Sequence, residues 1–350
     1  MEAKPSPIMR FLKIRGMPSA LAAFAGLIII FLVFGMIDSV VFRPANIQNL
    51  LRGMSVYLLI GIGQSFVLIT GNIDLSIGSV VGMSAMISAT LMSNGVPLIP
   101  AILITLVCCL MVGVLNGILV GKAKLPPFIT TLGTMFMARG VAIMVNGNRN
   151  TGLISGETGI SAETAQAFRD FFYFGRTLTL FNTFWIAMAI FAVFFFILSK
   201  TRSGRHIYAI GSNLDAAKLS GVNVPLTITK AYMVSAFCAF VVGLVRVAMT
   251  GMGFMEAGNM YEMFAVAAAV IGGISPMGGT GILLGTLAGA SVWQTLENGL
   301  NMVGAQVGIQ RLLIGAIVPL AVLIGVTLRS DGGAKVLTKW FVPSGKKKDA

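Results

Sequence analysis

The chain has 350 residues, of which 56% are hydrophobic and only 11% are charged, and its formal net charge is +13. This composition excludes an ordinary soluble globular domain and is typical of a protein that crosses a membrane several times. The basic excess is therefore interpreted as membrane topology, with no nucleic-acid partner expected. Cys108, Cys109 and Cys238 lie in apolar stretches and are interpreted as packing residues.

Long apolar segments predict about ten membrane-spanning helices. Crossing the hydrocarbon core takes about 20 apolar residues per helix, and helices are expected because lipid offers no partner to an unpaired backbone group. The predicted spans are 19–37, 53–70, 75–92, 98–120, 127–145, 181–198, 231–250, 261–275, 281–298 and 310–328. The third and eighth are short or interrupted by glycine, so broken or re-entrant forms are open. The predicted fold class is an all-α, polytopic helical bundle with one transmembrane domain at 19–328.

The distribution of Lys and Arg predicts which side each connection faces, because cytoplasmic segments carry the cationic excess. With a cytoplasmic N-terminus, the basic segment 1–18, the connection 199–230 and the basic tail 329–350 all lie inside. The outer segments then hold only Arg43, Arg52, Arg149, Arg169 and Arg176. An even number of spans with both termini cytoplasmic is the consistent solution.

The longest predicted outer segment is 146–180. It balances cations against acids and contains several glycines, so it can form a small external surface. Two interpretations stay open: a solvated connector, or a docking site for a periplasmic partner.

The connection 199–230 contains a predicted short helix. Gly211 interrupts the chain, and Asn213 can cap the backbone N–H groups that follow it. Asp215 then lies in the first turn, where the helix dipole favours an anion, and Gly221 fits a left-handed stop. A helix of about two turns is marginal alone in water and needs a surface to pack on. That surface belongs either to the chain's own spans or to another protein.

Asp74 is one of very few acids near apolar sequence. An ionisable group at membrane depth costs about 3 kcal/mol on insertion scales, which indicates a function or a buried partner. If Asp74 lies in a short connection instead, it caps a helix beginning at Leu75 or Ser76, and both interpretations stay open. Asn72, Asp74, Ser76 and Glu262 are the candidates for lining a solute pathway.

Glycines cluster at two places, where they permit close helix packing or an irregular turn. The candidate structural glycines are Gly71, Gly78, Gly272, Gly273, Gly278 and Gly279. The group around Pro276 predicts a turn between the eighth and ninth spans. His206 has no second ligand nearby in the sequence, so no metal site is predicted.

Several stretches of the sequence resemble one transporter family. The segment GRHIYAIGSNLDAAKLSGVNV at 204–224 is similar, nearly residue for residue, to a loop of permease subunits of the ribose, galactose, xylose and arabinose group of ABC importers. The other similar stretches are LITGNIDLSIGSVVG at 68–82, LPPFITTLGTMFMARG at 125–140 and YEMFAVAAAVIGGISPMGGTGILLGTLAGA at 261–290. Two positions depart from the family pattern, Asn72 where glycine is frequent and Phe264 where a second acid is usual.

The resemblance implies a permease subunit that works by ATP-driven alternating access in the bacterial inner membrane. It also implies a second permease subunit, a cytoplasmic ABC ATPase and a periplasmic sugar-binding protein. In this family the loop at 204–224 is implied to dock on the ATPase and transmit its closure. The residues carried over to that role are Gly204, Gly211, Asn213, Asp215, Ala216, Ala217, Leu219, Ser220 and Gly221.

The sequence lacks an ATP-binding loop of its own. A phosphate-cradling loop needs Gly, four residues and then Gly-Lys-Ser/Thr, and neither Gly-Lys pair of this chain has that spacing. We therefore expect no enzymatic activity and no cofactor in this chain, with ATP and Mg bound by the partner ATPase. The alternative is an ion-coupled secondary transporter, for which Asp74, Glu262 and Glu297 are the available ionisable residues.

Overall fold

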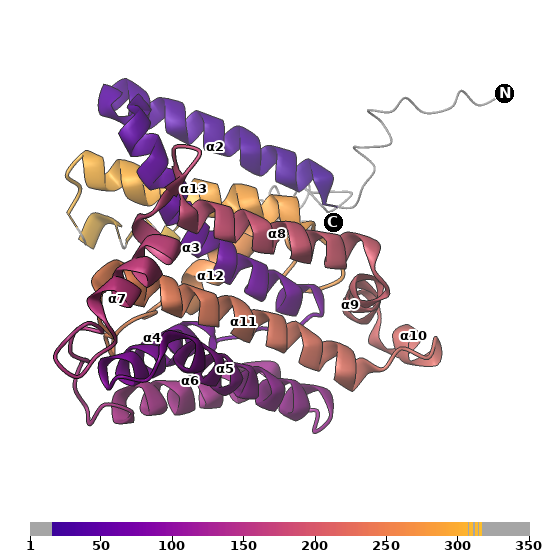
Figure 1. Ribbon diagram of the computed structural model, residues 1–350. Helices are drawn as coiled ribbons and strands as arrows, with labels where there is room; N and C mark the ends of the chain where they lie inside the picture. Colours follow the sequence, from indigo (N-terminus) through magenta and orange to yellow (C-terminus); the bar gives the residue numbers. More distant parts are fainter. Residues whose placement is uncertain (1–15, 307, 311, 314, 317–350) are drawn as a thin grey trace, which may run out of the picture.

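The structure is a computed structural model that describes residues 16–306, 308–310, 312–313 and 315–316 (Figure 1). The long helices are α2 (Met17–Ile37), α3 (Pro44–Ile69), α4 (Ile77–Ser93), α5 (Leu98–Gly121), α6 (Pro127–Met144), α8 (Asn182–Lys200), α11 (Val224–Thr250), α12 (Tyr261–Ile271) and α13 (Leu283–Met302). The shorter ones are η1 (Ser39–Phe42), α7 (Ala162–Arg169), η2 (Asp170–Phe174), α9 (Arg202–Ser212) and α10 (Leu214–Leu219). A minimal antiparallel hairpin, β1 (Arg176–Thr177) and β2 (Leu180–Phe181), pairs Arg176 with Phe181 and Thr177 with Leu180.

Helices α3 and α11 form the centre of the bundle and pack on each other. Nearly every side chain of α3 from Met54 to Ile69 is buried, whereas most side chains of α2, α5, α6 and α8 are exposed or only half-buried. An exposed apolar surface of this kind suits lipid, not water. Within the described residues, six helices are long and apolar enough to cross a membrane, namely α2, α3, α5, α6, α8 and α11.

Two apolar helices are shorter, and both begin inside the bundle. Before α4 the chain is irregular, and Asp74 accepts there from the Ser235 hydroxyl, near the middle of α11. Helix α12 begins at Tyr261, whose ring lies 6.3 Å from that of Tyr57 in the middle of α3. The first turns of α4 and α12 meet, since a Cβ added at Gly78 would contact the side chain of Glu262. The expectation that the third and eighth spans are short agrees with these bounds.

Several predicted boundaries were wrong. Helix α3 begins at Pro44, not at 53, because proline fits the first turn of a helix and the polar residues that follow are tolerated at its exposed end. Helix α11 begins at Val224, not at 231, where the Asn223 side chain accepts from the Leu226 backbone N–H at 3.1 Å. Arg52 therefore lies within a helix and not in an outer connection.

Three predictions fall on residues that the structure leaves undescribed. The tenth span, 310–328, lies almost entirely outside the described residues, and so do the tail 329–350 and most of the basic segment 1–18. The number of ten spans thus stays a prediction.

The bundle has two distinct ends, which we call the α9 end and the α7 end (Figure 1). At the α9 end, the Tyr208 hydroxyl donates to the Gly281 carbonyl at 2.7 Å, and a Cβ added at Gly16 would lie 2.9 Å from the Gly281 Cα. The start of α2, α9 and the turn before α13 therefore lie together. At the α7 end, Arg169 Nε donates to the Ala248 carbonyl at 3.1 Å, near the end of α11.

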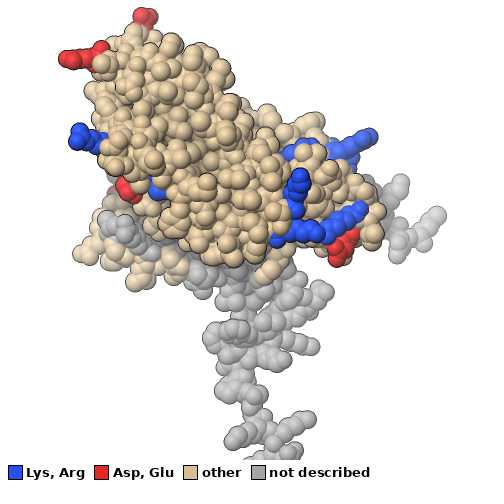
Figure 2. Space-filling model, turned by 90° about the horizontal axis from the view of Figure 1, so that it is seen from below, with Lys and Arg blue, Asp and Glu red and all other residues tan. Residues whose placement is uncertain are grey.

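Charge distinguishes the two ends. Figure 2 shows Lys and Arg gathered at the end that carries α9 and α10. The cations of the described connections and helix termini there are Lys122, Lys124, Lys200, Arg202, Arg205, Lys218 and Lys230. At the α7 end, Arg149, Arg169 and Arg176 are mixed with the acids Glu157, Glu163 and Asp170.

Candidate functional site

The connection between α8 and α11 folds as two helices, α9 and α10, which we call the coupling segment (202–219). The shorter helix, α10, agrees with the prediction. The Asn213 side chain accepts from the Ala216 backbone N–H at 2.9 Å, and Gly221 has a positive φ of 78° just past the helix end. Asp215 lies in the first turn and pairs with Lys218 at 3.2 Å.

Helix α10 presents an apolar side chain outward. Leu219 is 91% exposed and Leu214 is 42% exposed, whereas Ala217 is only 3% exposed. The neighbouring residues Ala216 and Ser220 are exposed as well. Ala217 thus anchors α10 to the chain itself, and Leu219 remains available for another surface. The sequence could not separate these two roles, because both residues are apolar members of the same six-residue helix.

Helix α9 was not predicted from the sequence, and it occupies much of the connection 199–230 before α10. The Thr201 side chain caps it by accepting from the Gly204 backbone N–H at 3.4 Å, and Ile207 and Ile210 are buried. Gly204 is also buried, and a Cβ there would contact the Leu198 carbonyl. The sequence does contain a signal for this helix, namely apolar residues at helical spacing. Polar and cationic residues between them masked it in an otherwise apolar chain.

Four glycines bind the end of α9 to the bundle, and we call them the glycine junction: Gly71, Gly211, Gly278 and Gly279. The Gly279 backbone N–H donates to the Ile69 carbonyl at the end of α3, at 2.8 Å. A Cβ added at Gly211 would contact that same carbonyl, and one at Gly278 would lie 2.8 Å from the Gly71 backbone N. The backbones of three separate segments can approach this closely only where side chains are absent.

The junction continues into a turn between α12 and α13, here called the glycine turn (272–282). A Cβ added at Gly272 would contact Gly285 in α13, and one at Gly273 would contact Ser19 in α2. Burial raises the pKa of Tyr208 to about 12, so its hydroxyl stays protonated and donates to the turn at neutral pH. The coupling segment is thereby in direct contact with α3 and with the turn that leads into α13.

The candidate pathway residues divide between two places. Asp74 is 2% exposed, and its carboxylate accepts from the Ser76 backbone N–H at 2.8 Å, the Ser76 hydroxyl at 2.6 Å and the Ser235 hydroxyl at 2.6 Å. Asn116 extends this network by donating to Ser76 at 2.9 Å, and Thr134 donates to Asn116 at 2.7 Å. Asp74 therefore stabilises the start of α4 and ties it to α5, α6 and α11.

Asn72 and Glu262 lie outside that network. The Asn72 amide donates to the Thr70 hydroxyl at 2.8 Å, which closes the chain reversal after α3. Glu262 is half-buried in the first turn of α12. Arg139 of α6 lies close enough to act on it electrostatically and donates to the Met255 carbonyl at 2.7 Å. The structure thus does not bring all four candidates together, and their role in a pathway stays a prediction.

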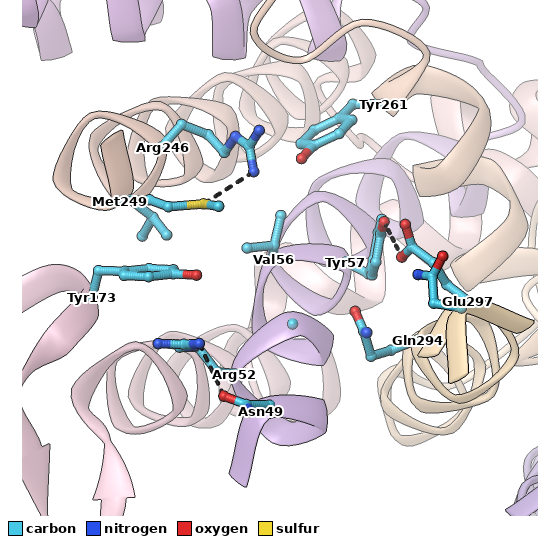
Figure 3. A pocket seen from close by; sticks show the side chains of 13 residues that line it. Asn49, Arg52, Val56, Tyr57, Tyr173, Arg246, Met249, Tyr261, Gln294 and Glu297 are labelled. Carbon is cyan, nitrogen blue, oxygen red and sulfur yellow. Dashed lines mark hydrogen bonds between the residues drawn. The ribbon is translucent and has the colours of Figure 1, made fainter. Parts of the chain in front are cut away.

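A polar cavity that the sequence did not predict lies between α3, α11, α12 and α13 (Figure 3). Its volume is about 270 Å³. Arg52, Tyr57, Arg246, Tyr261 and Glu297 line it and come from these four helices. Of these five residues, only Glu297 was a candidate from the sequence, as an ionisable residue for ion coupling. Nothing in the sequence shows which polar positions of different helices converge.

Comparison with known proteins identifies the family. The fold is that of a polytopic membrane protein with a cationic two-helix segment at one end of its bundle. The family described as "Branched-chain amino acid transport system / permease component" matches residues 46–325, and the chain belongs to this family.

Relatives within the family import sugars. The chain is 35% identical over 301 residues to the ribose import permease protein RbsC of Haemophilus influenzae, covering 86% of this chain and 91% of that protein. It is 34% identical over 314 residues to RbsC of Bacillus subtilis, covering 88% and 93%. The galactose/methyl galactoside import permease protein MglC of Escherichia coli is 33% identical over 291 residues, covering 80% and 85%. No solved structure matches the chain.

Proposed function

We propose that this chain is the permease subunit of an ABC importer that moves a monosaccharide or a sugar-like small molecule across the bacterial inner membrane. Its relatives at 33–35% identity over most of their length are named as import permeases for ribose and for galactose or methyl galactoside. In the proposed assembly two permease subunits enclose the pathway, a separate ATPase supplies energy, and a periplasmic binding protein delivers the solute.

The proposed orientation places the α9 end in the cytoplasm. The cations of the coupling segment and of the connection after α5 support this orientation, because cytoplasmic connections carry the Lys and Arg excess. The segment 146–181, with α7 and the β1–β2 hairpin, then faces the periplasm, where it is available to the binding protein.

The exposure of Leu219, on a helix that is fixed to the bundle, is the main support for docking of α10 on the ATPase. A six-residue helix is marginal in water, and a leucine that is 91% exposed stays unfavourably hydrated unless a partner covers it. An ATPase groove would supply that cover. Movement of α10 would then pass through α9 and the glycine junction to the end of α3 and to α13, as a rigid-body shift.

Substitution of Leu219 tests this function. Leu219→Asp is expected to abolish most ATP-driven sugar uptake and to weaken copurification of the ATPase, because a charge replaces the docking side chain. Leu178→Asp is the matched control, since Leu178 is 77% exposed at the α7 end and is expected to leave ATPase copurification unchanged. Ala217 is not suitable, because its burial means that an aspartate there would unfold α10 itself. Wild-type uptake by the Leu219→Asp variant would refute the docking role.

A further inference from the structure

We propose that the cavity between α3, α11, α12 and α13 binds the transported solute inside the permease, as an uncharged polyhydroxylated molecule of monosaccharide size. This inference rests on the proposed function, because it takes the solute to be sugar-like. The cavity of about 270 Å³ is near the lower end of the range for small-molecule pockets, about 300–1,000 Å³. That size suits one pentose or hexose ring.

Charged side chains reach the cavity with most of their hydrogen-bonding capacity unused. Within the described residues, no ion pair involves Arg52, Arg246 or Glu297. Arg52 donates to the Asn49 side chain at 2.9 Å, and Arg246 makes a weak contact to the Met249 sulfur at 3.5 Å. A guanidinium has five N–H donors, so several remain for a ligand.

Glu297 stands across the cavity from Arg52 and Asn49 (Figure 3). One of its carboxylate oxygens accepts from the Tyr57 hydroxyl at 2.6 Å, which fixes the carboxylate in place. The described contacts leave its other oxygen unused, and that oxygen can accept from a bound hydroxyl. Beside it, the Gln294 amide adds both a donor and an acceptor, and Gly53 leaves room for that amide, because a Cβ at Gly53 would contact it.

Aromatic rings complete the lining. Tyr173 and Tyr261 reach the cavity from opposite sides, while Tyr57 packs edge-on against Trp293 with ring centroids 6.5 Å apart. Rigid rings with a polar tip can cover the C–H face of a sugar while their hydroxyls meet its polar edge. The Phe264 ring packs edge-on against Tyr57, with ring centroids 5.8 Å apart, and helps to fix the position of that tyrosine.

A second buried polar group lies further along α3, beyond the cavity. Gln64 is fully buried in α3, and neither atom of its amide has a hydrogen-bond partner. Buried polar groups are nearly always satisfied, so an unsatisfied one indicates a water or ligand. Gln64 is seven residues beyond Tyr57, which places both on the same face of α3, two turns apart along the direction of the α9 end.

The charge pattern selects the ligand class. Glu297 would repel an anion, and the two arginines would repel a cation. A hydroxyl group both donates and accepts, so a ligand rich in hydroxyls can use the arginine donors, the carboxylate and the amides at once. We therefore favour a neutral polyol over a sugar acid or an ammonium compound.

Binding is measured on the full chain by protection of a thiol at the cavity mouth, with D-ribose and D-galactose as probes. Asn49→Cys places an exposed thiol there, and Cys108→Ala removes the half-buried native thiol, leaving Cys109 and Cys238 buried. Either sugar is expected to slow labelling by a charged thiol reagent several-fold. Adding Glu297→Gln should weaken the protecting sugar's apparent affinity by about tenfold or more, because a charged acceptor is lost. Glu163→Gln, on the exposed face of α7, is the matched control with no expected effect.

Uptake by the complete importer supplies the second readout. Glu297→Gln should lower the maximal uptake rate by about tenfold and change the ratio of ribose to galactose rates, which a purely structural defect would not alter. If uptake is ATP-driven but neither sugar protects the thiol and Glu297→Gln transports normally, the cavity proposal is wrong and the proposed function stands. If a sugar protects the thiol and ATP drives no uptake, the site stands and the importer function is wrong.

Discussion

Gly211 is the residue at which the coupling segment touches the bundle most closely. A Cβ there would contact the Ile69 carbonyl and the Gly279 backbone N, and neither backbone group can rotate away. We expect Gly211→Ala to destabilise the protein by about 1–3 kcal/mol through overpacking and to lower ATP-driven uptake. Thermal unfolding of the purified chain and uptake in cells measure the two effects.

Gly133→Ala is the control for this substitution. Gly133 is also helical, and a Cβ at this position meets no atom within 4 Å. Alanine there should be neutral or should stabilise α6 by about 0.5–1 kcal/mol, because it restricts the unfolded chain and favours the helix. Equal behaviour of the two variants would show that the glycine junction is not tightly packed.

The role of Asp74 was only partly predictable from the sequence. An acid before Leu75 and Ser76 predicts either a capping residue or a buried functional group. Helix α4 begins at Ile77, and the Asp74 carboxylate accepts from the Ser76 backbone N–H just before that helix. The decisive partner is Ser235, which lies 161 positions away along the chain. Hydropathy and spacing carry no information about such a contact, so the sequence could not choose between the two interpretations.

At the scale of elements, α10 depends on its local cap. Asn213→Ala removes the bond to the Ala216 N–H and should weaken α10 by about 1 kcal/mol, which speeds amide exchange in 214–219 about fivefold. Hydrogen exchange followed by mass spectrometry measures this change. Asn223→Ala removes the equivalent cap of α11, a 27-residue helix packed against the bundle, and should leave exchange in 214–219 unaltered. Unchanged exchange after Asn213→Ala would mean that tertiary contacts, not the cap, hold α10.

Elements were predictable where their signals are local. Asn213 and Gly221 mark the two ends of α10 in the sequence, and both act as expected. Helices α3 and α11 were predicted too short, because their starts carry polar residues that a search for apolar segments passes over. The depth at which α4 and α12 begin was not predictable, since it depends on the helices around them.

At the scale of the whole molecule, the charge difference between the two ends predicts orientation. A cysteine introduced by Ser212→Cys, exposed at the α9 end, should react with an impermeant reagent only from the cytoplasmic side. Glu157→Cys, exposed at the α7 end, should react only from the periplasmic side. Labelling of both positions from one side would contradict the separation of the two ends across the membrane.

The polar cavity also depends on the assembly of the whole bundle. Arg52, Arg246 and Glu297 lie far apart in the sequence and meet only when α3, α11 and α13 are assembled. The family and the short helix α10 were therefore predictable from the sequence, whereas the position of a polar site in the bundle depends on how the helices pack.

The most direct test of the account is to purify the tagged full-length chain gently from its native membrane, after crosslinking, and to identify its partners by mass spectrometry. We expect a separate ATPase with a phosphate-binding loop to copurify, at a stoichiometry comparable to the permease and reduced by Leu219→Asp. Absence of any ATPase, together with sugar uptake driven by an imposed ion gradient, would contradict it.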